Sequence, residues 1–190
     1  MENLFKAIRN SITLNPDAEK YLRSISKTIK ISKDSILIKE GQVVNKTYFV
    51  IEGCLRSYCV DKNAKNHTLQ FAIKNWWMSD YIAIHTDQVA VLTIESISDA
   101  TLIEFDVNKL NETLVLFPEF EVFQRKNLER HTVSLQKRIL NQLQLTAAER
   151  YDLFIKDYQE IEQHAPNYHI ASYLGVTQES LSRIRAKQNK

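Results

Sequence analysis

The alternation of hydrophobic and polar residues divides the chain into three zones, and the first zone runs to about Asp106. Near the start of this zone, Asn15 and Pro16 predict the cap and the first residue of a helix. Beyond Lys27 the apolar residues fall in short runs separated by polar turns, which is typical of strands. The predicted strands are 35–38, 48–51, 55–60, 67–73, 89–97 and 101–105, with a hairpin loop at 61–66. Many short strands at this spacing favour a β-sandwich or a small barrel-like roll.

The second zone predicts one long helix over residues 119–145. Neither glycine nor proline interrupts the chain between Pro118 and Pro166, and a helix of this length would span ~40 Å. Its apolar positions recur at steps of three and four residues and form one stripe. The stripe consists of Leu128, Thr132, Leu135, Ile139 and Leu143. The strands can cover one flank of this helix, so we predict that a second copy of the chain covers the other.

The third zone, 146–190, predicts several shorter helices. Thr146 and Glu149 form a capping-box pattern that begins a new helix. Further on, Gly175 is suited to end one helix and Thr177 to cap the next. The apolar positions that two crossed helices would bury are Ile170, Ala171, Leu174, Val176, Leu181 and Ile184. This spacing is typical of a helix-turn-helix that binds DNA.

The residues left to face outward on the last predicted helix have the chemistry of base and phosphate recognition. Gln178 can pair with adenine, Glu179 can accept from cytosine, and Arg183 can pair with guanine. Hydroxyls, cations and a helix N-terminus suit phosphates. From Ser180 onward the chain has four cations and no acid, although 146–190 is neutral as a whole. The predicted DNA contacts are Thr177, Gln178, Glu179, Ser180, Ser182, Arg183, Arg185 and Lys187.

Composition narrows the class of protein. The chain has 190 residues, 44% hydrophobic and 25% charged, with a net charge of +2, which predicts a globular protein of one domain or two small ones. Only three glycines are present, which excludes glycine-rich phosphate loops and the nucleophile elbow of hydrolases. The sequence shows neither a membrane-spanning run nor a signal peptide. We therefore expect a soluble, cytoplasmic protein that is not an enzyme.

A β-roll, a long helix and a C-terminal helix-turn-helix, in this order, resemble the Crp/Fnr family of bacterial transcription regulators. The resemblance rests on Glu40-Gly41, on 48–53 and on 181–184, and it covers nearly the whole chain. It implies an α+β fold with a cyclic-nucleotide-binding-like sensor roll (1–118), a dimerisation helix (119–145) and a DNA-binding domain (146–190). It also implies a homodimer whose partners are DNA, RNA polymerase and a small-molecule effector, with base readers at Gln178, Glu179 and Arg183. No cofactor is expected.

Two departures from the family pattern concern the effector and the DNA contacts. Asp80 takes the place of the family's ribose-binding Glu, but Ala90 and Val91 stand where an Arg-Ser pair should bind the phosphate. We therefore expect either no effector or one that is not a cyclic nucleotide bound in the usual way. We also expect no β-hairpin wing of the kind that family members often carry after the recognition helix. The phosphate contacts of such a wing would then be missing or supplied by Lys187 and Lys190.

Other signals remain open at this stage. His131 lies where the family places effector contacts, but it also suits a dimer seam or a surface position. Trp76 and Trp77 suit packing against the long helix or the wall of an apolar pocket. Cys54 and Cys59 point to opposite faces of one strand, which favours plain strand residues over a redox pair.

Two other classes of protein are alternatives. The first is a sensor or interaction module that binds no DNA, which salt-dependent retention on DNA would distinguish. The second is a metal-dependent cupin enzyme, which bound metal would reveal. It is disfavoured because the sequence has no His-x-His pair.

Overall fold

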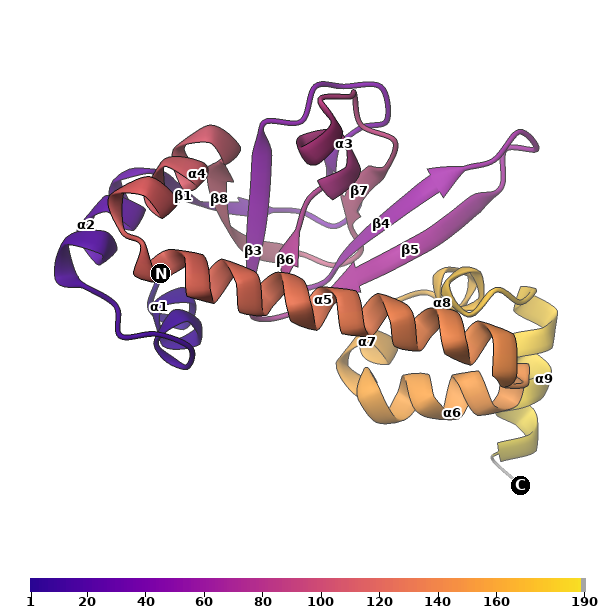
Figure 1. The fold of residues 1–190 in the computed structure, drawn as a ribbon. Helices are drawn as coiled ribbons and strands as arrows, with labels where there is room; N and C mark the ends of the chain where they lie inside the picture. The colour runs from indigo at the N-terminus through magenta and orange to yellow at the C-terminus, as the bar shows by residue number, and fades with distance from the viewer. Residues whose placement is uncertain (189–190) are drawn as a thin grey trace.

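The computed structural model describes residues 1–188, which form a β-roll followed by a long helix and a group of C-terminal helices (Figure 1). The strands are β1 (Ser26–Ile31), β2 (Ile36–Ile38), β3 (Lys46–Glu52), β4 (Leu55–Val60), β5 (Asn66–Ala72), β6 (Trp77–Met78), β7 (Thr93–Ser96) and β8 (Ala100–Asp106). The helices are α1 (Glu2–Arg9), α2 (Pro16–Ser24), α3 (Tyr81–Thr86), α4 (Val107–Leu116), α5 (Glu119–Gln144), α6 (Ala147–Asp157), α7 (Gln159–His164), α8 (Asn167–Leu174) and α9 (Gln178–Gln188).

Two antiparallel four-stranded sheets make the roll, in the orders β1-β8-β3-β6 and β2-β7-β4-β5. Apolar side chains from both sheets, including Val50, Leu55 and Leu102, are fully buried in one cluster. The turn between β3 and β4 requires Gly53, whose φ is +90°. A Cβ there would lie 2.4 Å from the Asp99 carbonyl oxygen, so the turn packs against the loop before β8.

The strand predicted at 89–97 is wrong in its first half, because β7 begins only at Thr93. Ala90 pairs instead with the loop after β2: its N–H donates to the Gln42 carbonyl at 2.8 Å, and its carbonyl accepts from Gly41 N–H at 2.8 Å. Ala90 and Leu92 are therefore buried in a connection and not in a strand, while Val89 is exposed.

Helices α1 and α4 had no sequence prediction, although α1 carries a helical pattern. Leu4, Phe5 and Ile8 are almost completely buried and belong to one cluster with Phe105 of β8 and Phe123 of α5. The N-terminal helix thus covers the outer face of the first sheet beside α5.

The long helix and its junction confirm the sequence prediction closely. Helix α5 spans Glu119–Gln144 and runs from the N-terminal helices, along the roll, to the C-terminal helices (Figure 1). The capping box at Thr146 and Glu149 begins α6. None of the helices within residues 1–188 is long and apolar enough to span a bilayer.

The C-terminal helices pack against the roll rather than standing apart from it. Phe154 and Ile170 belong to the same buried cluster as Cys54, Phe71 and Ile97 of the roll. One continuous apolar core therefore joins the second sheet to helices α6–α9.

Candidate functional site

Helices α8 and α9 meet at a tight turn whose geometry follows from its residues. Gly175 ends α8 with φ +70°, a conformation that glycine adopts without steric cost. The Thr177 hydroxyl oxygen accepts from Ser180 N–H at 3.2 Å and so caps α9. Leu181 is fully buried and Ile184 half-buried, which fixes the side of α9 that faces the protein.

The opposite side of α9 is exposed and polar. Gln178, Glu179, Ser182 and Arg183 are all exposed. The Glu179 backbone N–H and the Thr177 hydroxyl lower the pKa of the Glu179 carboxyl, so it is ionised at neutral pH and can only accept hydrogen bonds. The surface therefore offers a carboxylate, an amide, a hydroxyl and a guanidinium side by side on one helix.

Arg185 differs from the other predicted DNA contacts. Its guanidinium donates to the Tyr151 hydroxyl at 2.8 Å, to Glu162 Oε1 at 2.8 Å and to Asn167 Oδ1. These partners lie on α6, α7 and α8, so Arg185 ties α9 to its own bundle. Lys187 is exposed, while Lys190 lies outside the described residues.

The residues at the predicted nucleotide cassette form hydrogen bonds with neighbouring backbone groups of the protein itself. The Asp80 side chain is fully buried. It accepts from Ala83 N–H at 3.1 Å, capping α3, and from Val91 and Leu92 N–H at 2.8 and 2.9 Å. Because both carboxylate oxygens are engaged, Asp80 orders the segment that leads to β7. Ala90 is itself buried, in its pairing with the loop after β2.

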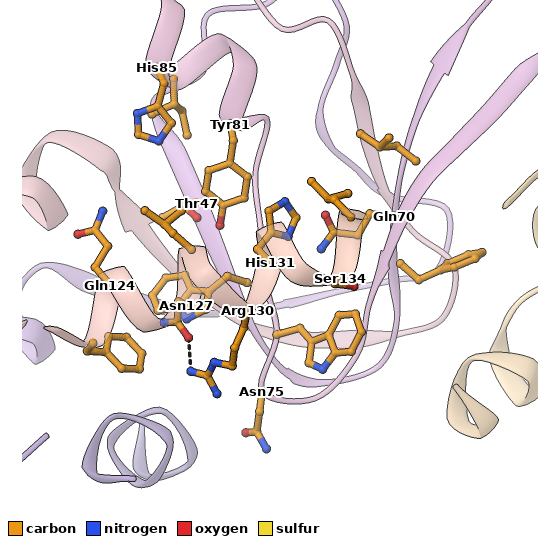
Figure 2. A pocket seen from close by; sticks show the side chains of 18 of the residues that line it. Thr47, Gln70, Asn75, Tyr81, His85, Gln124, Asn127, Arg130, His131 and Ser134 are labelled. Carbon is orange, nitrogen blue, oxygen red and sulfur yellow. Dashed lines mark hydrogen bonds between the residues drawn. The ribbon is translucent and has the colours of Figure 1, made fainter. Parts of the chain in front are cut away.

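A cavity of about 420 Å³ lies between the roll, α3, α5 and the C-terminal helices (Figure 2). Its volume falls in the range of small-molecule sites. Eight of the residues that line it are aromatic, namely Phe71, Trp76, Trp77, Tyr81, Phe120, Phe123, Tyr158 and Tyr173. The two tryptophans are therefore walls of the cavity; Trp76 also packs on Tyr158, and Trp77 on Phe49 and Phe105.

Neutral polar groups and cations complete the cavity lining. Figure 2 shows Tyr81, Thr47 and His131 turned toward one another, and the rings of Tyr81 and His131 have centroids 5.6 Å apart. Burial raises the pKa of Tyr81 to about 12 and lowers the pKa of His131, so both side chains are uncharged at neutral pH. Arg130 and Arg138 also line the cavity, and the described lining has no acid. A cationic ligand would find no counter-charge there.

The predicted dimer stripe is largely uncovered. Leu128, Ile139 and Leu143 are 42%, 60% and 77% exposed. Leu135 is half-buried and lines the cavity together with Leu128. An apolar row of this kind on one helix is suited to a helical partner.

Comparison with known proteins identifies the fold. Residues 28–115 match the family model of the cyclic nucleotide-binding domain. No curated protein sequence matches the chain significantly. The c-di-GMP-responsive global regulator CLP from Xanthomonas campestris superposes with a TM-score of 0.72 at 11% identity, over 92% of both chains. The chain has a Crp/Fnr-like fold.

Two further Crp/Fnr-like structures agree with this assignment. FixK2 from Bradyrhizobium japonicum superposes with a TM-score of 0.73 at 18% identity, over 87% of this chain and 85% of that one. A Crp/Fnr-family transcriptional regulator from Eubacterium rectale gives 0.70 at 16% identity, over 92% and 84%. The resemblance seen in the sequence is therefore confirmed at the level of the fold.

Several cavity residues had no sequence prediction. Among them are Tyr81, directly after Asp80, and Arg138, one turn beyond Ser134 on α5. The helical repeat places His131, Ser134 and Arg138 on one side of α5, and that spacing is the signal that could have found them. Within residues 1–188, no three His, Cys, Asp or Glu side chains gather as a metal site.

Proposed function

We propose that the chain is a Crp/Fnr-type transcription regulator that binds a two-fold symmetric DNA site as a homodimer. The exposed polar side of α9 is the observation that carries this proposal. Leu181 anchors that helix while Gln178, Glu179 and Arg183 stay exposed, as base readers must. The proposal includes a cytoplasmic location, contact with RNA polymerase and no catalytic role.

The dimer would form along α5. Its stripe of Leu128, Ile139 and Leu143 is exposed in one chain, and pairing two stripes would bury it. Two recognition helices would then lie ~34 Å apart on one face of the DNA. Light scattering at tens of micromolar should give twice the chain mass, and a monomer with and without DNA would contradict this arrangement.

DNA binding is tested with a site selected from random DNA. Fluorescence anisotropy should show tighter binding to the selected site than to random DNA of the same length. Binding should also weaken as salt rises, because bound phosphates release counterions. Absence of binding at low salt would instead support the alternative of a sensor or interaction module that acts without DNA.

The cavity beside α5 is the proposed effector site, and cyclic AMP is not its ligand. The Asp80 carboxylate is engaged by backbone N–H groups, and Ala90 offers no cation for a phosphate. Each missing charge-assisted hydrogen bond costs ~1.5–3 kcal/mol, which is about tenfold or more in affinity.

Calorimetry with cyclic AMP should therefore show no binding at micromolar concentrations. A micromolar dissociation constant would contradict this and would point to Arg130, a cation on α5 that lines the cavity.

A further inference from the structure

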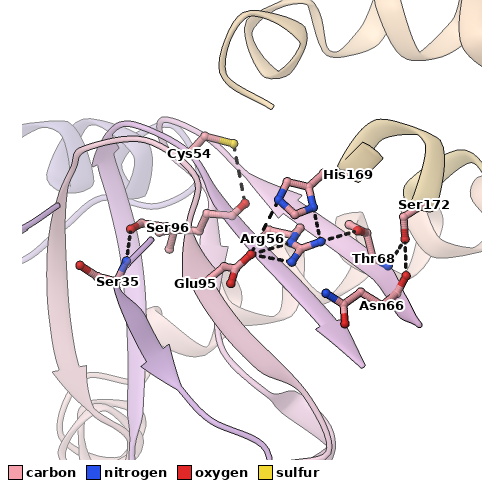
Figure 3. A network of polar contacts seen from close by, with 10 residues as sticks. Ser35, Cys54, Arg56, Asn66, Thr68, Glu95, Ser96, His169 and Ser172 are labelled. Atoms are coloured by element: carbon pink, nitrogen blue, oxygen red, sulfur yellow. Dashed lines mark hydrogen bonds and ion pairs between the residues drawn. The ribbon is translucent and has the colours of Figure 1, made fainter. Parts of the chain in front are cut away.

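A polar seam joins α8 to the second sheet of the roll (Figure 3). Arg56 on β4 is only 2% exposed. Its guanidinium donates to Glu95 Oε1 through Nε at 3.0 Å and through Nη2 at 2.5 Å, and to the Thr68 hydroxyl at 3.3 Å. It also donates to His169 Nδ1 on α8. One buried cation thus has partners on two neighbouring strands and on the C-terminal helices.

Ser172 continues the seam one helical turn further along α8. Its hydroxyl oxygen accepts from Thr68 N–H at 2.9 Å, and its hydroxyl donates to the Asn66 carbonyl at 2.8 Å. Strand β5 is an edge of its sheet, so these groups are ones that a further strand would otherwise bind. A side chain of α8 replaces that strand.

Arg138 brings the long helix into the same contact. Its guanidinium donates to the carbonyls of Thr68 and Tyr173 at 3.1 and 3.0 Å and to the carbonyl of Leu69. It also lies over the Tyr173 ring, 4.2 Å from the centroid. One side chain therefore ties helix α5 to strand β5 and to helix α8.

Directional bonds give this contact a register that apolar packing alone does not give. Hydrophobic burial is roughly proportional to area and non-directional, so α8 could slide on Phe71 at little cost. A shifted α8 would deprive the buried Arg56, which keeps Glu95, of its His169 partner. It would also leave the Thr68 backbone N–H without the Ser172 hydroxyl, and unpaired buried polar groups are costly. The seam therefore favours one position of α8 on the roll, and α9 follows through the Gly175 turn.

We infer that Arg56, His169, Ser172 and Arg138 are positioning residues that set the distance and angle between the two DNA-reading helices of the dimer. They determine the half-site spacing that the protein accepts, without touching DNA. The inference rests on the proposed DNA-binding function, and it adds the residues that decide spacing specificity.

The test compares the full chain with the double variant His169→Leu, Ser172→Ala, which removes the bonds that α8 side chains make to β4 and β5 and leaves α9 unchanged. The bond from Arg138 to the Tyr173 carbonyl remains in this variant. His164→Leu, at an exposed histidine of α7, is the matched control. Each protein is titrated by anisotropy against the selected site, against versions with one or two base pairs added or removed between half-sites, and against an isolated half-site.

The wild type and His164→Leu should lose about tenfold or more in affinity when the spacing changes, a penalty comparable to a mismatched base pair. The double variant should bind the native spacing more weakly, should discriminate spacings by less than about threefold, and should bind the half-site as the wild type does. Arg138→Gln should likewise weaken binding at the native spacing and reduce the discrimination between spacings. This variant replaces the double variant in the test if the double variant fails to fold.

Two results would overturn the inference while leaving DNA binding intact. One is an unchanged spacing preference in folded seam variants. The other is tighter binding of the native site by the variants, which would make the seam an inhibitory contact. If the wild type binds no DNA at all, the proposed function fails first and the positioning role fails with it.

Discussion

The two faces of the α8–α9 pair are built in opposite ways. On the face toward the roll, His169 is 6% exposed and Ser172 has two backbone partners on β5. On the face away from the roll, Gln178 and Arg183 are exposed, and within the described part of the chain Arg183 donates to the Glu179 carbonyl of its own helix at 3.4 Å and to no other residue. The first face fixes where the helix pair lies, and the second stays free to bind a partner.

The arginines show the same difference within one helix. Arg183 and Arg185 are two residues apart, so they project about 200° apart around α9. Arg185 lies one turn beyond the buried Leu181, and it binds Tyr151, Glu162 and Asn167. Its proposed phosphate contact stays a prediction, which these bonds disfavour. Arg183 is the stronger candidate for a DNA contact.

The largest effect is expected on the inward face, at Leu181. This side chain is fully buried between the C-terminal helices, so Leu181→Ala should lower the free energy of unfolding by about 2–5 kcal/mol. The neighbouring Ser182→Ala is the control, because Ser182 is exposed and should change stability by less than about 0.5 kcal/mol. Chemical denaturation followed by circular dichroism measures both. Equal stability of the two variants would mean that α9 is not packed against its neighbours through Leu181.

Local patterns predicted the parts of the fold that depend on neighbouring residues. The cap at Asn15, the capping box at Thr146 and the extent of α5 all follow from spacing within a few turns, and each is confirmed. The strand at 55–60 coincides with β4. A resemblance in the order of elements supplied the rest of the architecture.

The seam and the cavity could not be predicted in this way. Arg56 and His169 are 113 residues apart in the chain, and nothing near either residue indicates that they meet. Asp80 was placed at a ligand position, but its carboxylate caps α3 and binds the segment before β7. Tertiary contacts decide which polar side chains bind other parts of the protein. The pattern of residues along a single sequence does not reveal those contacts.

On the outward face, Arg183→Ala should cost ~1–3 kcal/mol per half-site if the guanidinium pairs with guanine. The loss should appear on the selected site and be much smaller on random DNA, because only the base contact is removed. Anisotropy on the two DNAs measures it, and Arg183→Lys, which keeps the charge, separates the base contact from simple attraction. Equal losses on both DNAs would reassign Arg183 to the phosphates.

The inward face should also make stability depend on pH through His169. Burial, together with the charges of Arg56 on β4 and Lys33 before β2, lowers the pKa of His169 to about 3. Glu95 lies 3.9 Å from Nε2, but its charge is paired with Arg56. As the pH falls through about 6.5, the His169 imidazole therefore becomes protonated in the unfolded chain but stays neutral in the folded chain. The free energy of unfolding should be highest above that pH and fall as the solution becomes acidic.

The expected slope from this group is at most about 1.4 kcal/mol per pH unit below pH 6.5. His169→Asn is the matched variant, because its amide oxygen can accept from Arg56 and does not titrate. The difference in unfolding free energy between wild type and variant should shrink from pH 7.5 to pH 5. A constant difference would show that the folded protein accepts the proton at His169 as readily as the unfolded chain.

The smallest effect is expected at Lys187, on the outward face near the end of α9. Lys187 is exposed, and a lysine bound to phosphate contributes a point charge without base preference. Lys187→Ala should therefore weaken binding to the selected site and to random DNA alike. The slope of log affinity against log salt should fall by about one for each phosphate that the lysine neutralises. Lys20→Ala, at an exposed lysine of α2 on the far side of the roll from α9, is the control and should leave the slope unchanged. A loss of affinity confined to the selected site would make Lys187 a base reader. An unchanged salt slope would show that Lys187 does not contact DNA, and the exposed side of α9 would then act through Gln178, Glu179 and Arg183.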